Sequence, residues 1–269
     1  MTECHPFDAA MHLDALGDGR YRGATSPEYA NMIGPFGGLI AAIMLQSACL
    51  GEERLGDPTA LTVNFCGPIA DGVFEITTRA VRTNRSSQHW SMELEQGGGI
   101  AVTATAVFAR RRPTWSRTEA RYPDVPPANA VERAMAFRMP WAQRYAMRFV
   151  RGPFPSLIED LPGAEPLTQV WLADDPPRPI DFVSLAALSD AFFPRIFLRR
   201  PIWTPIGTVS LTVYIHADAN SLAAQADRPV LGSAWASHFG NGMFDEHVEV
   251  WSDDGHFLAS AHQVVYFKE

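Results

Sequence analysis

The stretch Met32–Leu50, MIGPFGGLIAAIMLQSACL, carries no charged residue along its whole length. A helix that is apolar on every side is either a membrane span or a helix surrounded by a protein core. The Gly-Pro-Phe-Gly-Gly run at Gly34–Gly38 leaves only about a dozen residues for the helix, too few to cross a bilayer. The sequence therefore predicts a buried core helix after Gly38.

Four strands are predicted to follow this helix. Their sequences either alternate apolar and polar residues, as in WSMELE, or are rich in β-branched residues, as in IAVTATAVF. They lie at Leu61–Phe65, Phe74–Val81, Trp90–Glu95 and Ile100–Phe108. An antiparallel sheet of these strands must wrap around the helix to cover its apolar surface.

The same order of elements recurs in the second half of the chain. An apolar helix is predicted at Phe182–Phe193, and the triplet Leu211-Thr212-Val213 repeats Leu61-Thr62-Val63. The strands of this copy are predicted at Trp141–Val150, Val209–Ile215, Gly232–His238, His247–Trp251 and Phe257–Phe267. A weak repeat of this kind indicates two copies of one structural unit.

Two tandem α+β units are therefore expected. A parallel α/β fold would require helices and strands to alternate along the chain, and they do not. Residues 111–131 contain several prolines and charges, which is typical of a linker that crosses the surface. We expect an N-terminal unit over residues 1–112, a linker over 113–138 and a C-terminal unit over 139–269.

Composition and charge restrict the class of protein. The chain of 269 residues is 46% hydrophobic and 19% charged, as in a globular protein with a substantial core. Its formal charge of -8 argues against a nucleic-acid partner and against binding to an anionic membrane. Cys4, Cys49 and Cys66 have neither CxxC nor zinc-type spacing, and residues 1–22 lack the features of a secretion signal. A cytoplasmic location is expected.

Asp190 is the anomalous residue of the predicted core. The motifs GxSxG, HExxH, GxGxxG and GxxxxGK[ST] are absent, which excludes the common hydrolase and nucleotide-binding signatures. A carboxylate on a core helix is costly unless it is hydrogen-bonded or protonated, and either condition makes Asp190 a functional candidate. The alternative is that Asp190 faces a solvent channel or caps a helix break before Pro194.

Three polar residues of the second copy have no identical counterpart at the corresponding positions of the first copy. Asp190 corresponds to Gln46. Thr208 and Gln263, which are both expected to lie on strands, align near Pro58 and Val107. Taken singly, each could be a routine strand residue. Together they make the two copies unequal, with one polar constellation in the second.

Short motifs in both copies point to one family. They are Gly34–Gly38, Phe65–Pro68, Asn84–Ser87, Leu188–Asp190, Gly207–His216 and Leu258–Gln263. In their order and spacing the chain resembles the double hotdog acyl-CoA thioesterases over nearly its whole length. The resemblance implies a tandem hotdog fold, in which an antiparallel sheet wraps a long buried helix in each repeat. It also implies an acyl-CoA substrate, a role in fatty acid metabolism, and a homodimer or higher homo-oligomer.

The resemblance also assigns catalytic residues. In that family an Asp, a Thr and a Gln of the second repeat are catalytic, and they match Asp190, Thr208 and Gln263. Asp190 is expected to activate a water molecule that Thr208 and Gln263 hold by hydrogen bonds, without a covalent nucleophile. A single set of these residues implies one active site per chain.

Substrate contacts are predicted at the start of the first helix. The free N–H groups of Gly37 and Gly38 suit a developing oxyanion, although a Gly-Gly pair could equally serve close packing. Phe36 is expected to line an acyl tunnel with Phe192 and Phe193, or simply to belong to the core.

Arg85, Ser86 and Ser87 form a predicted turn between two strands. A guanidinium and hydroxyl groups suit the phosphates of coenzyme A, although an exposed hairpin Arg is commonly just solvated. No cofactor is expected, since coenzyme A is part of the substrate. No metal is expected either, because the histidines are scattered without fixed spacing. These include His89, His216, His238 and His262.

Two other functions stay open at this point. A non-catalytic acyl-CoA or lipid-binding protein could share the fold without turnover. An enoyl-CoA hydratase is the other alternative, but the D-x-N-P-x-H segment of hydratases with this fold is absent from the sequence. Release of free thiol from acyl-CoA would separate hydrolysis from both.

Overall fold

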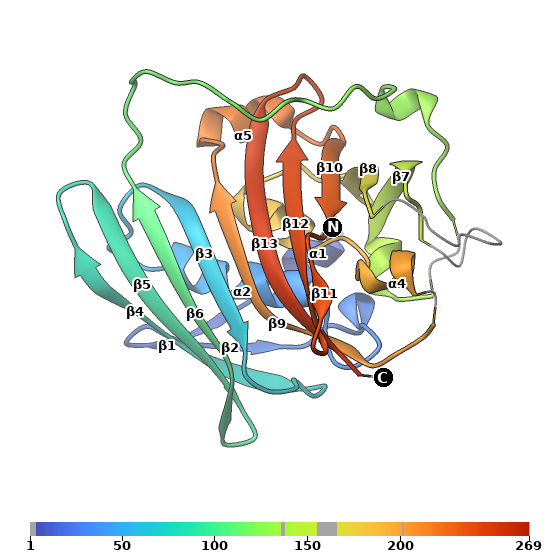
Figure 1. Ribbon diagram of the computed structural model, residues 1–269. Helices are drawn as coiled ribbons and strands as arrows, with labels where there is room; N and C mark the ends of the chain where they lie inside the picture. Colours follow the sequence, from blue (N-terminus) through green and yellow to red (C-terminus); the bar gives the residue numbers. More distant parts are fainter. Residues whose placement is uncertain (1–3, 136–137, 155–165, 201, 269) are drawn as a thin grey trace.

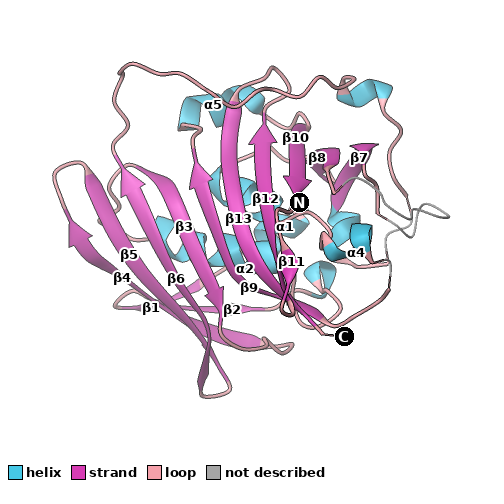
Figure 2. Ribbon diagram, in the orientation of Figure 1, coloured by secondary structure: helices cyan, strands magenta, loops and turns pink. Residues whose placement is uncertain are grey.

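The computed structural model describes residues 4–135, 138–154, 166–200 and 202–268. One large antiparallel sheet curves around a small group of helices (Figure 1, Figure 2). The strands are β1 (Asp14–Gly17), β2 (Arg20–Ala24), β3 (Asp57–Phe65), β4 (Val73–Thr83), β5 (Ser87–Gln96), β6 (Gly99–Ala109), β7 (Tyr145–Arg151), β8 (Thr168–Asp174), β9 (Ile206–Ile215), β10 (Val230–Trp235), β11 (Phe239–Gly240), β12 (Met243–Trp251) and β13 (Phe257–Phe267).

The helices are short apart from one. They are α1 (Pro6–Ala10), α2 (Gly37–Cys49), α3 (Phe182–Leu188), α4 (Ile196–Arg199) and α5 (Ala219–Gln225). Single 3-10 turns lie at Pro27–Tyr29, Ala128–Ala130 and Trp141–Arg144. No helix among the described residues is long and apolar enough to span a membrane.

The sheet has the same strand order in its two halves. Neighbouring strands run β1-β2-β4-β5-β6-β3 and then β9-β13-β12-β10-β8-β7, with β11 paired to β12. In each half the strand that follows the main helix, β3 or β9, pairs with the last strand of its half, β6 or β13. The two halves are therefore arranged about a common centre.

The repeated triplets meet at this centre. Strand β3 pairs with β9 so that Thr62 lies opposite Thr212, and their hydroxyl oxygens are 3.0 Å apart. Leu61 faces Val213 and Val63 faces Leu211, so the two copies of Leu-Thr-Val are antiparallel to one another. The sequence repeat thus marks the place where the two halves join into one sheet.

Helix α2 is the buried core helix that the uncharged stretch predicts. All of its residues except Gly37, Gln46 and Cys49 are buried, and it packs against β3, β4, β5 and β6. Figure 1 shows it behind the sheet, on the concave side. Because every face of the helix meets apolar side chains, an amphipathic pattern is not needed.

The second helix is shorter than predicted. We expected it to extend over Phe182–Phe193, but α3 ends at Leu188. The N–H groups of Asp190 and Ala191 donate to carbonyls three residues earlier, and Phe192 donates to Asp190 at 2.8 Å. This tightening ends the helix before Pro194, which disfavours helical geometry in the preceding residue. The prediction of a long helix in the second half is therefore wrong.

Most predicted strands lie within observed ones, with two partial exceptions. The strand predicted at Gly232–His238 ends at Trp235, and the strand predicted at Trp141–Val150 begins with a 3-10 turn before β7. The sequence patterns did not predict the strands β1, β2, β8 and β11 or the helices α1, α4 and α5. These lie mainly at the two ends of the sheet, where patterning is weaker.

The segment between the halves crosses the outer face of the sheet. Ala120, Val125, Ala128 and Val131 pack against a buried cluster of Trp171, Leu231 and Trp251. The indole Nε1 of Trp171 donates to the carbonyl of Pro126 at 2.9 Å. Figure 1 shows this segment, in green, running across the top of the molecule from one half to the other.

Candidate active site

Asp190 lies in the turn that follows α3, directly against the start of α2. Its side chain is buried, with 8% of the residue exposed. A Cβ atom placed on Gly37 would lie 2.9 Å from Oδ2 of Asp190, so the carboxylate and the first turn of α2 are in contact. The early end of α3 is what frees Asp190 to point at this helix start.

Thr208 and Gln263 complete a chain of hydrogen bonds to Asp190. The hydroxyl of Thr208 donates to Oε1 of Gln263 at 3.0 Å, and Nε2 of Gln263 donates to Oδ1 of Asp190 at 3.1 Å. The two residues come from adjacent strands, β9 and β13, whose inner faces meet here. Because its amide oxygen accepts and its nitrogen donates, Gln263 is held in one orientation.

The electrostatic surroundings favour the protonated form of Asp190. Burial, followed by repulsion from Glu246, raises the pKa of Asp190 to about 8. The hydrogen bond from Gln263 and the N–H of Gly38 stabilise the carboxylate and act in the opposite direction. Desolvation is the larger effect, so the carboxyl is poised to exchange a proton near neutral pH.

Glu246 and Arg195 are buried charged residues that the sequence reading missed. Glu246 lies opposite Gln263 in the β12–β13 register, and its Oε1 is 3.6 Å from Nε of the fully buried Arg195. Burial raises the pKa of Glu246 to about 7, while Arg195 acts to lower it. The signal was present: Glu246 interrupts the apolar series Phe244, Val248 and Val250 on the buried face of β12.

The residue of the first half that corresponds to Gln263 is Ala106. Leu211 faces Gln263 across β9–β13, and Leu61 faces Ala106 across β3–β6. The comparison of the two copies in the sequence aligned Gln263 near Val107, one residue from Ala106. A shift of one residue in a strand moves the side chain to the opposite face of the sheet. Ala106 is buried and apolar, so the first half has no polar group at this position.

The two glycines at the start of α2 have different surroundings. A Cβ atom on Gly38 would lie 2.6 Å from the carbonyl oxygen of Ala187 and 2.4 Å from the ring of Phe36. Gly38 therefore allows α2 and α3 to approach closely, in agreement with the expectation that the Gly-Gly pair serves close packing. Its N–H also stabilises the Asp190 carboxylate. The role of both N–H groups toward an oxyanion stays a prediction.

Phe36 belongs to an aromatic cluster beside this helix start. Its ring stacks on Trp141 with centroids 4.3 Å apart and meets Tyr145 edge-on. Phe36 and Phe192 belong to the same buried core cluster. Phe193 packs instead on Phe154 and lies under the guanidinium of Arg195. Phe193 also contacts Phe149, which packs against that cluster, and the lining of an acyl tunnel by the three phenylalanines stays a prediction.

The predicted coenzyme A turn is not close to Asp190. Arg85 and Ser86 are exposed, and the neighbouring Gln88 accepts a hydrogen bond from Leu55, just beyond the end of α2. Asp190 contacts the start of the same helix. Since α2 has 13 residues, the two places are about 20 Å apart along its axis.

A surface cavity lies nearer to the three polar residues. It opens beyond the end of β13, four residues from Gln263, beside the short helix α4. It is lined by Ile196, Arg199, Arg200, Phe239, Gly240, Asn241, Gly242 and Phe267. Apolar and basic side chains thus meet at one opening.

A curved antiparallel sheet around a buried helix, with polar residues at the helix start, defines a hotdog-fold protein. A solved structure from Alicyclobacillus acidocaldarius, described as a conserved protein of unknown function with a hot dog fold, is 46% identical. The match covers 99% of both chains with a TM-score of 0.93. No curated protein matches the sequence.

The family follows from domain models that match both halves. The acyl-CoA thioesterase N-terminal domain matches residues 26–109, and the acyl-CoA thioesterase C-terminal domain matches residues 118–267. The chain belongs to this acyl-CoA thioesterase family.

More distant structures share the fold. The acyl-CoA thioesterase II TesB2 from Mycobacterium marinum is 19% identical, over 97% of this chain and 98% of that one, with a TM-score of 0.79. The tesB protein from Mycobacterium avium subs paratuberculosis is 16% identical over 98% of both chains, with a TM-score of 0.80.

Proposed function

We propose that the chain hydrolyses acyl-CoA thioesters to the free acid and coenzyme A at one site formed by Asp190, Thr208 and Gln263. The observation that carries the proposal is the hydrogen-bond chain from Thr208 through Gln263 to a buried carboxylate at the start of a helix. Membership of the acyl-CoA thioesterase family supports the same reaction class. The proposed organisation is a tandem hotdog with units 1–112 and 139–269 joined by the linker 113–138.

Asp190 acts as the general base in this proposal. The carboxylate accepts a proton as a water molecule attacks the thioester carbonyl carbon, and the bond between that carbon and sulfur then breaks. The thiolate leaves and takes up a proton, so the products are a carboxylic acid and coenzyme A thiol. Thr208 and Gln263 orient the water and the carboxylate for this step. A raised pKa makes Asp190 a stronger base than an exposed carboxylate.

The start of α2 stabilises the oxyanion in the same proposal. The first N–H groups of a helix have no partner within it and carry a partial positive charge. Gly37 provides such a group beside Asp190, and the N–H of Gly38, which also bonds the Asp190 carboxylate, is shared between that carboxylate and the oxyanion. A substrate whose carbonyl oxygen approaches them has its scissile carbon near the water that Asp190 activates.

Replacing Asp190 tests the assignment. We expect Asp190→Asn to lower kcat for acyl-CoA by about two to four powers of ten, the usual loss for a general base. The measurement is release of free thiol from a panel of acyl-CoA substrates, with Asp227→Asn, on the α5–β10 turn, as the matched control. Turnover retained in Asp190→Asn would contradict the role of this carboxylate. Absence of thiol release by the unaltered protein across the panel would favour a binding protein.

The place of the coenzyme A nucleotide needs a separate test. Arg85 is the residue that the sequence predicts, whereas Arg199 lies at the cavity nearer to Gln263. Arg85→Ala is expected to raise KM for acyl-CoA severalfold and to leave KM for a short thioester without the nucleotide unchanged. If Arg199→Ala produces that pattern and Arg85→Ala does not, the nucleotide binds at the cavity and the Arg85, Ser86 and Ser87 assignment is wrong.

A further inference from the structure

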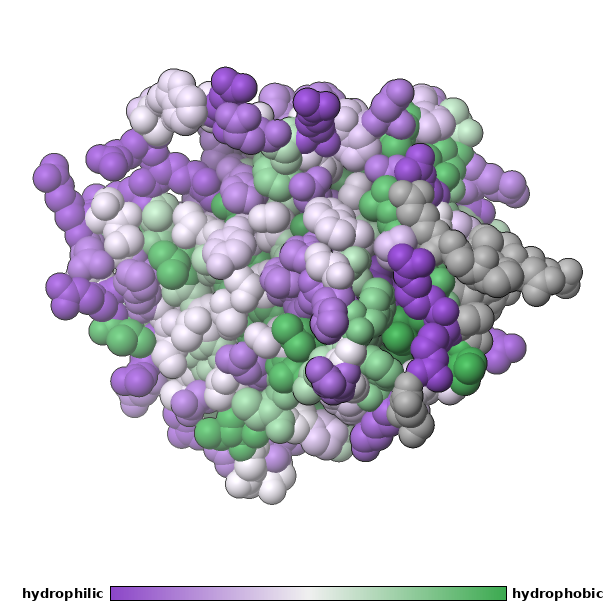
Figure 3. All heavy atoms as spheres, viewed as in Figure 1, coloured by the Kyte–Doolittle hydropathy of each residue, from purple (hydrophilic) through white to green (hydrophobic). Residues whose placement is uncertain are grey.

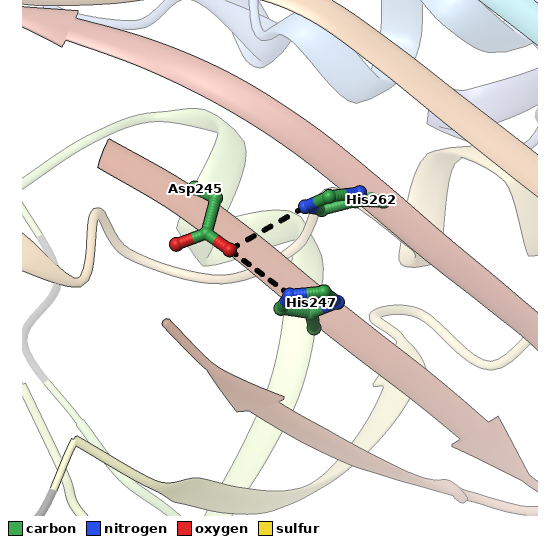
Figure 4. Close-up of side chains that lie close together, drawn as sticks. All are labelled: Asp245, His247 and His262. Atoms are coloured by element: carbon green, nitrogen blue, oxygen red, sulfur yellow. Dashed lines mark hydrogen bonds and ion pairs between the residues drawn. The ribbon is translucent and has the colours of Figure 1, made fainter. Parts of the chain in front are cut away.

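Three potential metal ligands come together on the outer face of the sheet. Asp245 and His247 are two residues apart on β12, and His262 lies directly opposite His247 on β13. Because side chains alternate along a strand, all three project from the same face (Figure 4). No fixed spacing in the sequence reveals this group, since β12 and β13 bring His262 to His247 only through their pairing.

The distances suit a single metal ion. Oδ2 of Asp245 is 2.9 Å from Nε2 of His247 and 3.5 Å from Nε2 of His262, and the three ligand atoms all lie within 4.8 Å of one another. Zinc bonds to nitrogen and oxygen of about 2.0–2.2 Å place the ligand atoms of a tetrahedral site about 3.3 Å apart. The imidazoles of His247 and His262 are stacked, with centroids 4.0 Å apart and planes 13° from parallel, so the half-exposed His262 ring must turn before both Nε2 atoms face one ion.

Neighbouring groups hold the ligands in place. Oδ1 of Asp245 accepts the N–H groups of Ser237 at 2.9 Å and His238 at 2.8 Å, which leaves Oδ2 facing the imidazoles. His247 stacks on Trp235 with ring centroids 5.4 Å apart, and its Nε2 lies 3.1 Å from Oγ of Ser237, a contact that a bound ion would replace. Carboxylates and imidazoles that bind metals are commonly fixed by such outer contacts.

We propose that Asp245, His247 and His262 bind a Zn²⁺ ion on the outer face of the sheet. Two imidazoles and one carboxylate are ligands that suit zinc, and they leave a fourth position for water. Figure 3 shows that this face of the molecule mixes hydrophilic and apolar side chains, and His262 is about half exposed, so an ion can reach the site from solvent.

The site lies behind the proposed catalytic residues. Glu246 separates Asp245 from His247 on β12, and His262 precedes Gln263 on β13. A bound ion would fasten β12 to β13 at the position where their inner faces carry Glu246 and Gln263. The inference does not depend on the proposed hydrolysis, because binding is measured without turnover.

Calorimetric titration of the tag-free full-length chain with Zn²⁺ tests the site. After treatment with a chelator, the protein is expected to bind one Zn²⁺ per chain and to unfold at a higher temperature with the ion than without it. His247→Ala and Asp245→Asn should each weaken binding by more than the ~10–100-fold that follows loss of an outer-shell partner. Co²⁺ in place of Zn²⁺ should give the absorption bands of a bound ion, absent from both variants.

His256 provides the matched control. It lies 3.6 Å from Asp254 at the surface, with its side chain 75% exposed and no second histidine in that pair. His256→Ala should bind Zn²⁺ like the unaltered chain. Equal Zn²⁺ affinity in the unaltered chain and in His247→Ala would overturn the proposal, as would loss of the stoichiometric ion in His256→Ala. Thermal unfolding without metal establishes that each variant is folded.

Discussion

Asp190 is held between two opposed influences. Burial disfavours its charge, whereas the start of α2 and the amide of Gln263 favour it. A buried carboxylate without partners would be strongly destabilising. The hydrogen bonds of Gln263 and Gly38 reduce that cost without removing it, which leaves a residue whose proton affinity lies in the range useful for catalysis.

The rate should therefore depend on pH in a defined direction. A general base must be unprotonated, so kcat/KM is expected to rise with pH through about 8, the pKa of Asp190. Glu246→Gln removes a nearby negative charge, which lowers the pKa of Asp190 and moves the rise to lower pH. The measurement is kcat/KM from pH 5.5 to about 9.5 for both proteins, at fixed ionic strength.

Two controls accompany the pH profiles. Glu246→Gln keeps the shape of the side chain, and circular dichroism establishes that the variant is folded. Glu249→Gln changes a carboxylate on the same strand whose side chain lies on the outer face. Its profile should match that of the unaltered protein. An unchanged profile in Glu246→Gln would mean that Glu246 does not act on Asp190.

Residue-level reasoning from sequence identified Asp190 because an acid on an apolar helix is costly. Thr208 and Gln263 became candidates only through comparison of the two copies and the family resemblance. Glu246 was visible as a break in strand alternation, but the predicted strand began at His247, one residue later. Arg195 has no local signal, because its burial depends on Glu246 from a distant strand.

At the level of elements, the contact between α2 and α3 depends on Gly38. Alanine favours a helix over glycine by about 0.5–1 kcal/mol, so propensity alone predicts that Gly38→Ala stabilises the protein. A Cβ atom 2.6 Å from the carbonyl oxygen of Ala187 would force the two helices apart. Overpacking of this kind costs about 1–3 kcal/mol, so the net change is expected to be destabilising.

Thermal unfolding measures the sign of this change. Gly38→Ala should lower Tm by a few degrees, since each kcal/mol shifts Tm by about 2–4 °C in a chain of this size. Gly67→Ala is the control, because a Cβ atom there meets nothing within 4 Å. A higher Tm for Gly38→Ala would show that the helices yield without cost and that close packing does not explain the glycine.

Strands were predicted correctly where apolar and polar residues alternate in the local sequence and so mark one face of the strand as buried. Strand β13 was predicted with its observed bounds, Phe257–Phe267. Strand β1 has no buried residue, so no alternation marks it. Helix α3 ended early because Asp190, Phe192 and Pro194 form a turn that an apolar run does not reveal. Tertiary contacts determine these elements more than local propensity does.

For the whole molecule, the shared sheet makes the two halves interdependent. Strands β3 and β9 exchange hydrogen bonds across the centre, where Thr62 meets Thr212. The guanidinium of Arg111 donates to the carbonyls of Pro58, Ile215 and His216 and so ties the ends of the same two strands together. Separating the halves would expose both strand edges and the contact between α2 and α3.

The protein should therefore unfold in a single transition, although sequence length and repeats would allow two independent domains. Calorimetric and van't Hoff enthalpies measured on the full chain are expected to agree. Arg111→Ala should lower the one Tm, because it removes the hydrogen bonds that link the partly buried carbonyls of Pro58 and Ile215 across the joint. Arg117→Ala, which removes an exposed pair with Glu119, should leave Tm nearly unchanged. Two separate transitions would instead mean that β3 and β9 contribute little to stability and that each half is held by its own helix and strands.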